Sequence, residues 1–442
     1  MFTTLQNAFK IKEIRTKLLF TLAMLVIIRL GSQLPVPGVN RDFFSDWFAM
    51  QTGDAFNFFD AFTGGSFLSF SILALNITPY ITSSIIMQLL TIAIPKLEEM
   101  QKEGEEGRKK IASITRYVTV GLALVESTAM TIGFRNQNIL QVGYNWIDIC
   151  AVIFALTAGS AFLMWVGEQI TEKGVGNGIS VVLVINIISS LPRDITNLFD
   201  QFVRGKSIPA GIVNGLVILA IILGMVILVI LLNGGVRRIP VQYAKKVQGR
   251  RMVGGQTSAI PLKVNTSGVI PIIFASSLLQ FPVVISSFFY QGGTSGFWDT
   301  ALKYLNSSNW FRLTVQGEQI YTIGMLVYMF LVIFFAYFYT AITFNPREVS
   351  ENLKKQGGFI PGIRPGKPTS EHMTRILNHV VLIGAVFLAV IGVLPFVFNG
   401  LFNASVSFGG TSLIIIVSVI LDTIKQIESQ MMVRNYKGFL ND

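Results

Sequence analysis

The chain has 442 residues, of which 51% are hydrophobic and 13% are charged, and its formal net charge is +11 at pH 7. Soluble domains carry about 25% charged residues, so this composition excludes a soluble globular protein and indicates a polytopic α-helical membrane protein. One cysteine and two histidines exclude a disulfide framework, and we expect neither a metal site nor a cofactor.

Apolar runs near the membrane-spanning length of about 20 residues recur along the chain. We expect ten spans, at residues 18–34, 71–94, 114–134, 146–166, 179–191, 210–232, 268–289, 320–344, 376–398 and 408–427. Lys and Arg gather in the N-terminal segment and in two long loops, which marks that side as cytoplasmic and places both termini there. The run 210–232 is the most uniformly apolar and is expected to face lipid. The polar stretch 193–209 is expected to be a hinge.

A short aromatic segment at residues 54–62 precedes the second span. Asp54 is a candidate N-cap and Gly64 a candidate C-cap, so we predict a helix that covers about half of a hydrocarbon core. The second span carries Ser, Thr and Asn, and we expect Pro79 to break it. Irregular backbone at membrane depth needs protein or water around it, so this arrangement indicates a cavity.

Three other stretches have ordinary interpretations. Arg29 lies near the far end of the first span, where its side chain is expected to reach the interface. The polar run 102–110 is expected to be a solvated loop. The Gly-rich run 173–178 lacks the spacing and strand context of a phosphate-binding loop.

The two long basic loops cover residues 234–263 and 345–375. In the first, residues 239–244 and 259–264 are predicted to pair as strands. Positive-inside bias explains basic loops but not loops of this length, and long ordered loops are usually functional. We therefore interpret them as a docking platform for a cytosolic partner, either ribosomal RNA or an acidic protein surface.

The second basic loop begins with a helix signal. Asn345 is the predicted N-cap, Pro346 lies in the first turn, Glu348 is the capping-box acid, and Gly357 ends the helix. A Pro/Gly-rich turn follows and is expected to expose Arg364.

The residues inside the spans limit the possible chemistry. Glu126 is the one clear carboxylate in the middle of a span, which is thin for an ion-coupled transporter. No predicted span contains the residue set of an intramembrane protease, so we do not expect an enzyme. Ile77 and Ile81 are one helical turn apart. They either contribute to a constriction that seals without charge or simply pack in the bundle.

Ten spans divide into five plus five, and an odd number of spans per half inverts the second half relative to the first. The second and seventh spans are both dotted with Ser or Thr and both contain Pro. This correspondence is consistent with inverted repeats.

Several motifs occur in order along essentially the whole chain. They are PVPG at 35–38, NITPYI at 76–81, GEQITE at 167–172, GNGIS at 176–180, QGRR at 248–251, FNPR at 344–347, PGIRPG at 361–366 and FGGTS at 408–412. With these motifs the chain resembles the SecY family, the channel subunits of the bacterial protein translocase.

The resemblance implies a clamshell of ten helices around a central pore. Its halves would be residues 1–200 and 201–442, and residues 56–67 would form a plug helix. The implied pore ring is Ile77, Ile81, Leu183, Ile273 and Ile415, in which Leu183 departs from an all-isoleucine ring but remains apolar and branched. The implied plug residues are Phe56, Phe59, Phe62, Gly64 and Gly65. The implied lateral-gate residues are Thr82, Glu126 and Asn265, between spans two and three on one side and seven and eight on the other.

The same resemblance implies the activity and its partners. The expected function is translocation of unfolded preproteins across the bacterial plasma membrane, with lateral release of transmembrane segments into lipid. Arg250, Arg251 and Arg364 match positions that dock the SecA motor or the ribosome. SecE and SecG would be the membrane partners, and signal sequences of preproteins and the lipid bilayer would meet the channel directly.

Overall fold

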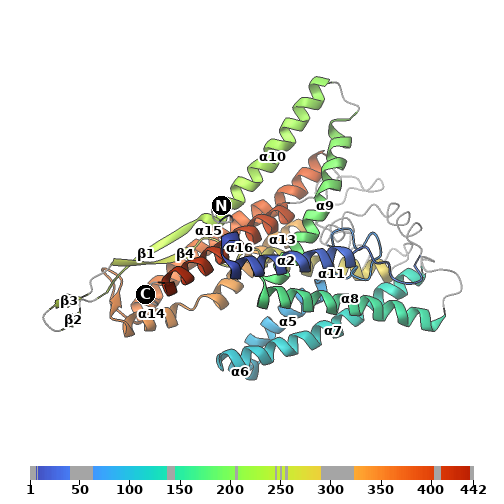
Figure 1. Cartoon of the computed structure of the whole chain (residues 1–442). Coiled ribbons are helices and arrows are strands. Elements are labelled where there is room, and N and C mark those ends of the chain that lie inside the picture. The colour runs from blue at the N-terminus through green and yellow to red at the C-terminus, as the bar shows by residue number, and fades with distance from the viewer. Residues whose placement is uncertain are drawn as a thin grey trace.

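The computed structural model describes residue 6 and residues 8–39, 63–136, 145–204, 208–243, 246–248, 251–253, 257–289, 323–402 and 410–438. These residues are mostly helical, with one small sheet at one end (Figure 1). The predicted helix 54–62, with Phe56, Phe59 and Phe62, lies outside the described residues, as does Arg250.

A helix covers most of each predicted span. These helices are α2 (Lys12–Gly31), α5 (Thr78–Ala93), α7 (Glu105–Asn136), α8 (Trp146–Lys173), α9 (Gly178–Phe202), α10 (Ile208–Gly234), α11 (Ile270–Phe289), α13 (Gly324–Thr343), α15 (Lys367–Phe402) and α16 (Gly410–Gly438). In the described part of the chain, six helices are long and apolar enough to cross a membrane, or seven if α5 and the helix after it form one bent span. The chain is therefore a multi-pass membrane protein. As predicted, α10 is the least buried of the six.

The second span differs from its prediction. Helix α5 begins only at Thr78, and residues 64–77 form successive turns. Pro79 lies in the first turn of α5 and does not break the span, because N–H groups in the first turn of a helix have no acceptor within that helix. Asn76 has φ +53, which turns the chain just before the helix starts.

Two predicted loops are helical. The solvated run near 102–110 is occupied by α6 (Pro95–Lys102) and by the start of α7, with Gly104 at φ +82 between them. A Cβ on Gly107 would lie 1.7 Å from the carbonyl oxygen of Met100, so a glycine lets the two helices meet closely. The stretch predicted to be a hinge, residues 193–209, is helical up to Phe202, because α9 continues through Pro192.

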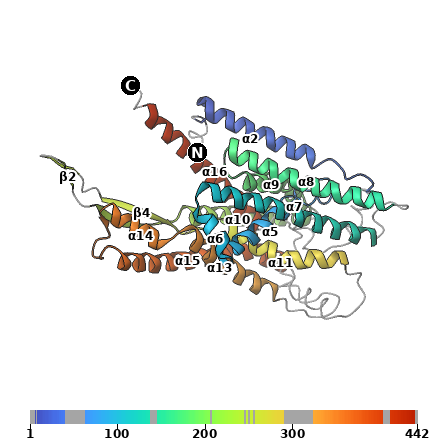
Figure 2. The same cartoon turned by 90° about the horizontal axis from the view of Figure 1, so that it is seen from below.

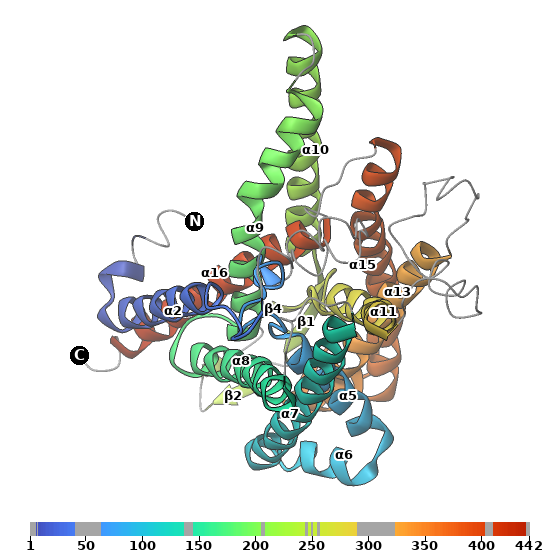
Figure 3. The same ribbon diagram turned by 90° about the vertical axis from the view of Figure 1, so that its right-hand side faces the viewer.

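The helices pack in two groups. In the first group α7 contacts α5 and α8, and α8 contacts α2 and α9; in the second, α13 contacts α11 and α15, and α16 contacts α10 and α15. The groups meet along two lines. Along the first line, α11 packs against α5 and α7 (Figure 3). Along the second, α9 packs against α10 and α16.

The two basic loops form one platform. Strand β1 (Val236–Tyr243) pairs antiparallel with β4 (Thr257–Lys263), with Ile239 opposite Ile260, which confirms the predicted strand pair. Between them, β2 (Lys246–Gln248) and β3 (Arg251–Val253) make a separate hairpin. Strand β5 (Gly358–Phe359) belongs to the second loop and pairs with the other edge of β1. Sequence reasoning missed this last pairing, which joins the loops.

Helix α14 (Pro346–Lys355) lies beside this sheet, and Figures 1 and 2 show both at the same end of the helical body. Asn345 Oδ1 accepts hydrogen bonds from the backbone N–H groups of Arg347 and Glu348 at 3.1 and 3.5 Å, so the predicted N-cap is confirmed. The platform has its own buried apolar cluster, which includes Ile239 from β1 and Leu353 from α14.

Candidate pore site

The five residues predicted to form a ring come together in one buried apolar cluster. They are Ile77, Ile81, Leu183, Ile273 and Ile415, and none is more than 7% exposed. They come from the start of α5, from α9, from α11 and from α16, so both groups of helices contribute. A collar of aliphatic side chains without charge can close a passage by excluding water.

The backbone before α5 is fixed by hydrogen bonds that end at this collar. Asn186 on α9 donates from Nδ2 to Oδ1 of Asn76 at 2.9 Å, and Ser160 on α8 donates to the carbonyl oxygen of Asn76 at 3.1 Å. Asn76 directly precedes Ile77, and Asn186 lies about one turn after Leu183. Two collar residues are thereby positioned by a polar contact among α5, α8 and α9.

The turn at Gly64 and Gly65 lies against the same helix. Both residues have positive φ, at +66 and +82, a conformation that glycine adopts readily. A Cβ on Gly64 would lie 2.6 Å from the carbonyl oxygen of Asn186 and from Oγ of Ser189. The turn can therefore approach α9 this closely only with glycine at position 64.

The prediction for Arg29 is wrong. Its Nη1 and Nη2 both donate to the carbonyl oxygen of Gly64 at 3.3 Å, and Ser189 Oγ lies 3.2 Å from the same oxygen. Arg29 is half-buried, near the end of α2. The guanidinium turns inward because the buried carbonyl oxygen of Gly64 needs a hydrogen-bond donor. A guanidinium directed at the membrane interface would not reach this oxygen. We call Arg29, Gly64, Asn76, Ser160, Asn186 and Ser189 the Gly64 seat.

The three predicted lateral-gate residues make their contacts in different places. Thr82 bonds to the carbonyl oxygen of Thr78 within α5 at 3.1 Å. Asn265 donates to Asn233 Oδ1 at 2.8 Å, and Asn233 in turn donates to Ser418 Oγ at 2.6 Å, so Asn233 links α10 to α16 and Asn265 joins this pair from the segment before α11. Glu126 on α7 has a buried carboxylate oxygen, Oε1, without a hydrogen-bond partner in the described structure.

A different pair crosses between the two groups of helices. The hydroxyl of Tyr339 on α13 donates to Oε1 of Gln88 on α5. The Tyr339 ring also packs edge-on against Phe274 of α11, with centroids 5.1 Å apart. We call the contact of α5 and α7 with α11 and α13 the gate seam. Sequence reasoning missed this pair, although a glutamine inside an apolar span was a signal.

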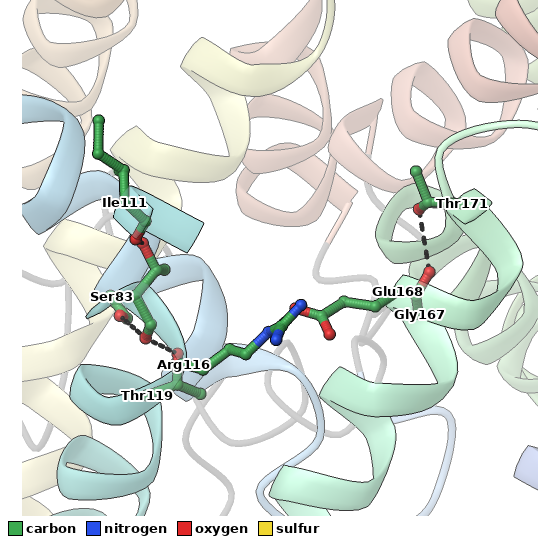
Figure 4. Close-up of polar contacts among 8 residues, drawn as sticks. Ser83, Ile111, Arg116, Thr119, Gly167, Glu168 and Thr171 are labelled. Carbon is green, nitrogen blue, oxygen red and sulfur yellow. Dashed lines mark hydrogen bonds and ion pairs between the residues drawn. The ribbon is translucent and has the colours of Figure 1, made fainter. Parts of the chain in front are cut away.

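The first group of helices is tied together by further polar contacts. Ser83 on α5 donates to the carbonyl oxygen of Thr115 on α7 at 2.9 Å, and Arg116 Nε on α7 donates to Glu168 Oε1 on α8 at 2.8 Å (Figure 4). Because Ser83 and Thr115 are both buried, separating α5 from α7 would leave polar groups unpaired.

Of the predicted docking residues, Arg364 is exposed in the turn after β5, and Thr369 Oγ1 donates to its carbonyl oxygen at 2.8 Å. Arg251 is the first residue of β3. Within the described residues, no group of three or more His, Cys, Asp or Glu could hold a metal ion.

Comparison with known proteins identifies the family. The SecY family model matches residues 71–424. The protein translocase subunit SecY of Halalkalibacterium halodurans is 43% identical over 446 residues, covering 100% of both chains. Among solved structures, a protein-conducting channel is similar with a TM-score of 0.61 at 18% identity, covering 94% of this chain and 92% of that one. Sec61 in the canine ribosome–channel complex is similar with a TM-score of 0.57 at 18% identity, covering 94% and 92%. The chain belongs to the SecY family of protein translocase subunits.

Proposed function

We propose that this chain is the channel of a protein translocase, through which unfolded preproteins cross the membrane and from which apolar segments leave sideways into lipid. The observation that carries the proposal is that the five aliphatic residues of the proposed collar lie buried in one cluster to which both groups of helices contribute. An uncharged collar binds no ion and favours no particular side chain, which suits a passage for chains of any sequence.

The finer architecture is part of the proposal. Residues 1–200 and 201–442 form inverted halves of five spans each, and residues 56–67 form a plug that covers the collar. The pairing of α5 with α11 across the gate seam supports this division, because the second and seventh spans are the ones that share polar and Pro residues.

The gate seam is the proposed lateral exit. An apolar segment in the collar gains a few tenths of a kcal/mol per Leu, Ile, Phe or Val on entering lipid, whereas a charge at mid-span costs about 2.5–3.5 kcal/mol. A gap between α5 and α11 would let each segment sample that difference. Thr82, Glu126 and Asn265 are proposed to tune this exit.

The proposed partners follow from the platform and the family. SecE and SecG accompany the channel in the bacterial plasma membrane, with both termini cytoplasmic, and SecA or the ribosome pushes the chain. The platform supports this because Arg364 is exposed on a turn at one end of the molecule. The structurally similar canine Sec61 is bound to a ribosome.

Reconstitution tests the function. Vesicles that contain the purified chain, its partner subunits and a motor ATPase should protect an added preprotein from protease. If they move no preprotein but accumulate a small solute under an ion gradient, the chain is a transporter and the proposal fails.

The collar has its own test in planar bilayers. Ile81→Ser should raise the resting ion conductance, because a hydroxyl in the collar favours water. Ile92→Ser is the matched control, since Ile92 lies on the same helix but is 55% exposed. Equal conductance of the two variants would mean that Ile81 only packs.

A further inference from the structure

An arginine inside a membrane span is costly unless its charge has a partner, and such residues usually serve a function. The head group of Arg29 is directed at the buried turn ahead of α5. Its two donors converge on one acceptor, the carbonyl oxygen of Gly64.

The acceptor belongs to a turn that is held from two other directions. On one side, Gly64 presses against Asn186 and Ser189 of α9. On the other, Phe70 is 1% exposed and packs edge-on against Phe134 of α7, with centroids 5.2 Å apart. The turns from 63 to 77 therefore lie between α2, α7 and α9, and they lead directly into Ile77 of the collar.

The polar contacts of the seat run in an unbroken series toward the collar. Arg29 bonds to the carbonyl oxygen of Gly64, and the Ser189 hydroxyl joins that oxygen to the carbonyl oxygen of Asn186. The side chain of Asn186 then bonds to Asn76 beside Ile77. Ser189 adds a weaker contribution, because its single hydroxyl proton is shared between Gly64 and the carbonyl oxygen of Asn186, at 3.2 and 2.7 Å.

We propose that Arg29 is a positioning residue for the closed channel: its guanidinium holds the Gly64 turn on α9, and so keeps the chain ahead of α5 in the conformation that seals the collar. The bond joins a charged donor to a backbone carbonyl, so it is strong enough to hold the turn. No covalent change or protonation is needed to release it. When a translocating chain moves residues 63–77 away, the guanidinium is freed to reach the interface.

This inference rests on the proposed function, and its test is resting conductance without any preprotein. Arg29→Met removes all five donors and keeps an unbranched side chain. Since hydrogen bonds to charged groups contribute more than neutral ones, the closed–open equilibrium should shift about tenfold toward the open state, and the resting conductance should rise accordingly. Arg29→Lys, which keeps one charged donor, should restore part of the seal.

Arg15→Met is the matched control, because Arg15 is exposed at the other end of α2. It should leave conductance unchanged. Ser189→Ala should raise conductance by about twofold, and it serves as the second variant if Arg29→Met does not fold. Translocation of a preprotein with a weakened signal sequence should increase in Arg29→Met, whereas a merely structural role would lower translocation of every preprotein.

The outcomes distinguish the positioning role of Arg29 from the proposed channel function. If wild-type vesicles translocate preprotein but Arg29→Met and Ser189→Ala keep the wild-type conductance, the positioning role is overturned and the channel function stands. If Arg15→Met leaks as much as Arg29→Met, the effect comes from charge in general, and the role is again overturned. If wild-type vesicles move no preprotein at all, the proposed function itself fails.

Discussion

The Gly64 seat and the gate seam are held together by different forces. The seat lies within the first group of helices and consists of buried and half-buried polar contacts that join the turns before α5 to α2, α8 and α9. At the gate seam, α5 contributes Ile81 and Ile85 and α11 contributes Ile273 and Phe274 to one apolar cluster, and the Gln88–Tyr339 hydrogen bond crosses it.

The membrane makes this difference consequential. Lipid tails are as apolar as leucine, so apolar contact between two helices can be exchanged for contact with lipid at little cost. A buried hydrogen bond cannot be exchanged in this way, because lipid offers no donor or acceptor. With one side-chain hydrogen bond named across it, the gate seam is expected to part more readily than the first group of helices, in line with the proposed lateral exit.

The largest effect is expected from Gly64→Ala. The new Cβ would meet backbone and side-chain atoms of α9 at 2.6 Å, in a residue with φ +66. We expect the seat to be destabilised by about 2–4 kcal/mol, as the sum of overpacking and backbone strain, with a large rise in resting conductance.

Gly65→Ala separates overpacking from backbone strain. Gly65 also has positive φ, at +82, but nothing lies within 4 Å of its Cβ position. The Gly65→Ala variant should be destabilised by backbone strain alone, by about 1 kcal/mol, and its resting conductance should rise much less than that of Gly64→Ala. Equal leak from both variants would show that Gly64 does not depend on close contact with α9.

A smaller effect is expected at the gate seam from Tyr339→Phe. The change removes the hydroxyl that bonds Gln88 but keeps the ring against Phe274. Losing one neutral hydrogen bond is worth about 0.5–1.5 kcal/mol, so the seam should open several-fold more readily. Crosslinking between cysteines placed on α5 and α11 should slow, and preproteins with weak signals should pass more easily.

Tyr337→Phe is the control for that experiment. The Tyr337 hydroxyl bonds to the carbonyl oxygen of Asn378, so it joins α13 to α15 within the second group of helices. Gating should be unchanged. A double-mutant cycle with Gln88→Leu should give no additional effect in Tyr339→Phe, and full additivity would contradict the pairing.

The smallest effect on the Gly64 seat and on the gate seam is expected from Arg364→Glu. This side chain is exposed on the platform and belongs neither to the Gly64 seat nor to the gate seam. Motor or ribosome binding should weaken, more strongly at low salt, while resting conductance and thermal stability stay at wild-type values. Unchanged binding affinity would remove Arg364 from the docking surface.

Much of the architecture could be predicted from local patterns. Apolar run length located the helices, alternation and turn residues located the pairing of β1 with β4, and Asn345 with Pro346 located the start of α14. The errors were also local in kind: a proline expected to break a span instead began α5, and a polar loop expected to be irregular formed α6 and the start of α7.

The sequence by itself determined that this is a membrane protein and where its helices lie, and its motifs pointed to five aliphatic residues that share one buried cluster. These features could be predicted because they depend on the hydrophobicity of short segments, on capping residues within a few positions, or on sequence motifs. Only the tertiary structure decided that Arg29 turns inward to Gly64, 35 residues away, and that Gln88 meets Tyr339, 251 residues away. Which donor reaches which acceptor depends on how distant helices pack, and an apolar span has the same composition whether its few polar groups face a partner or the interface.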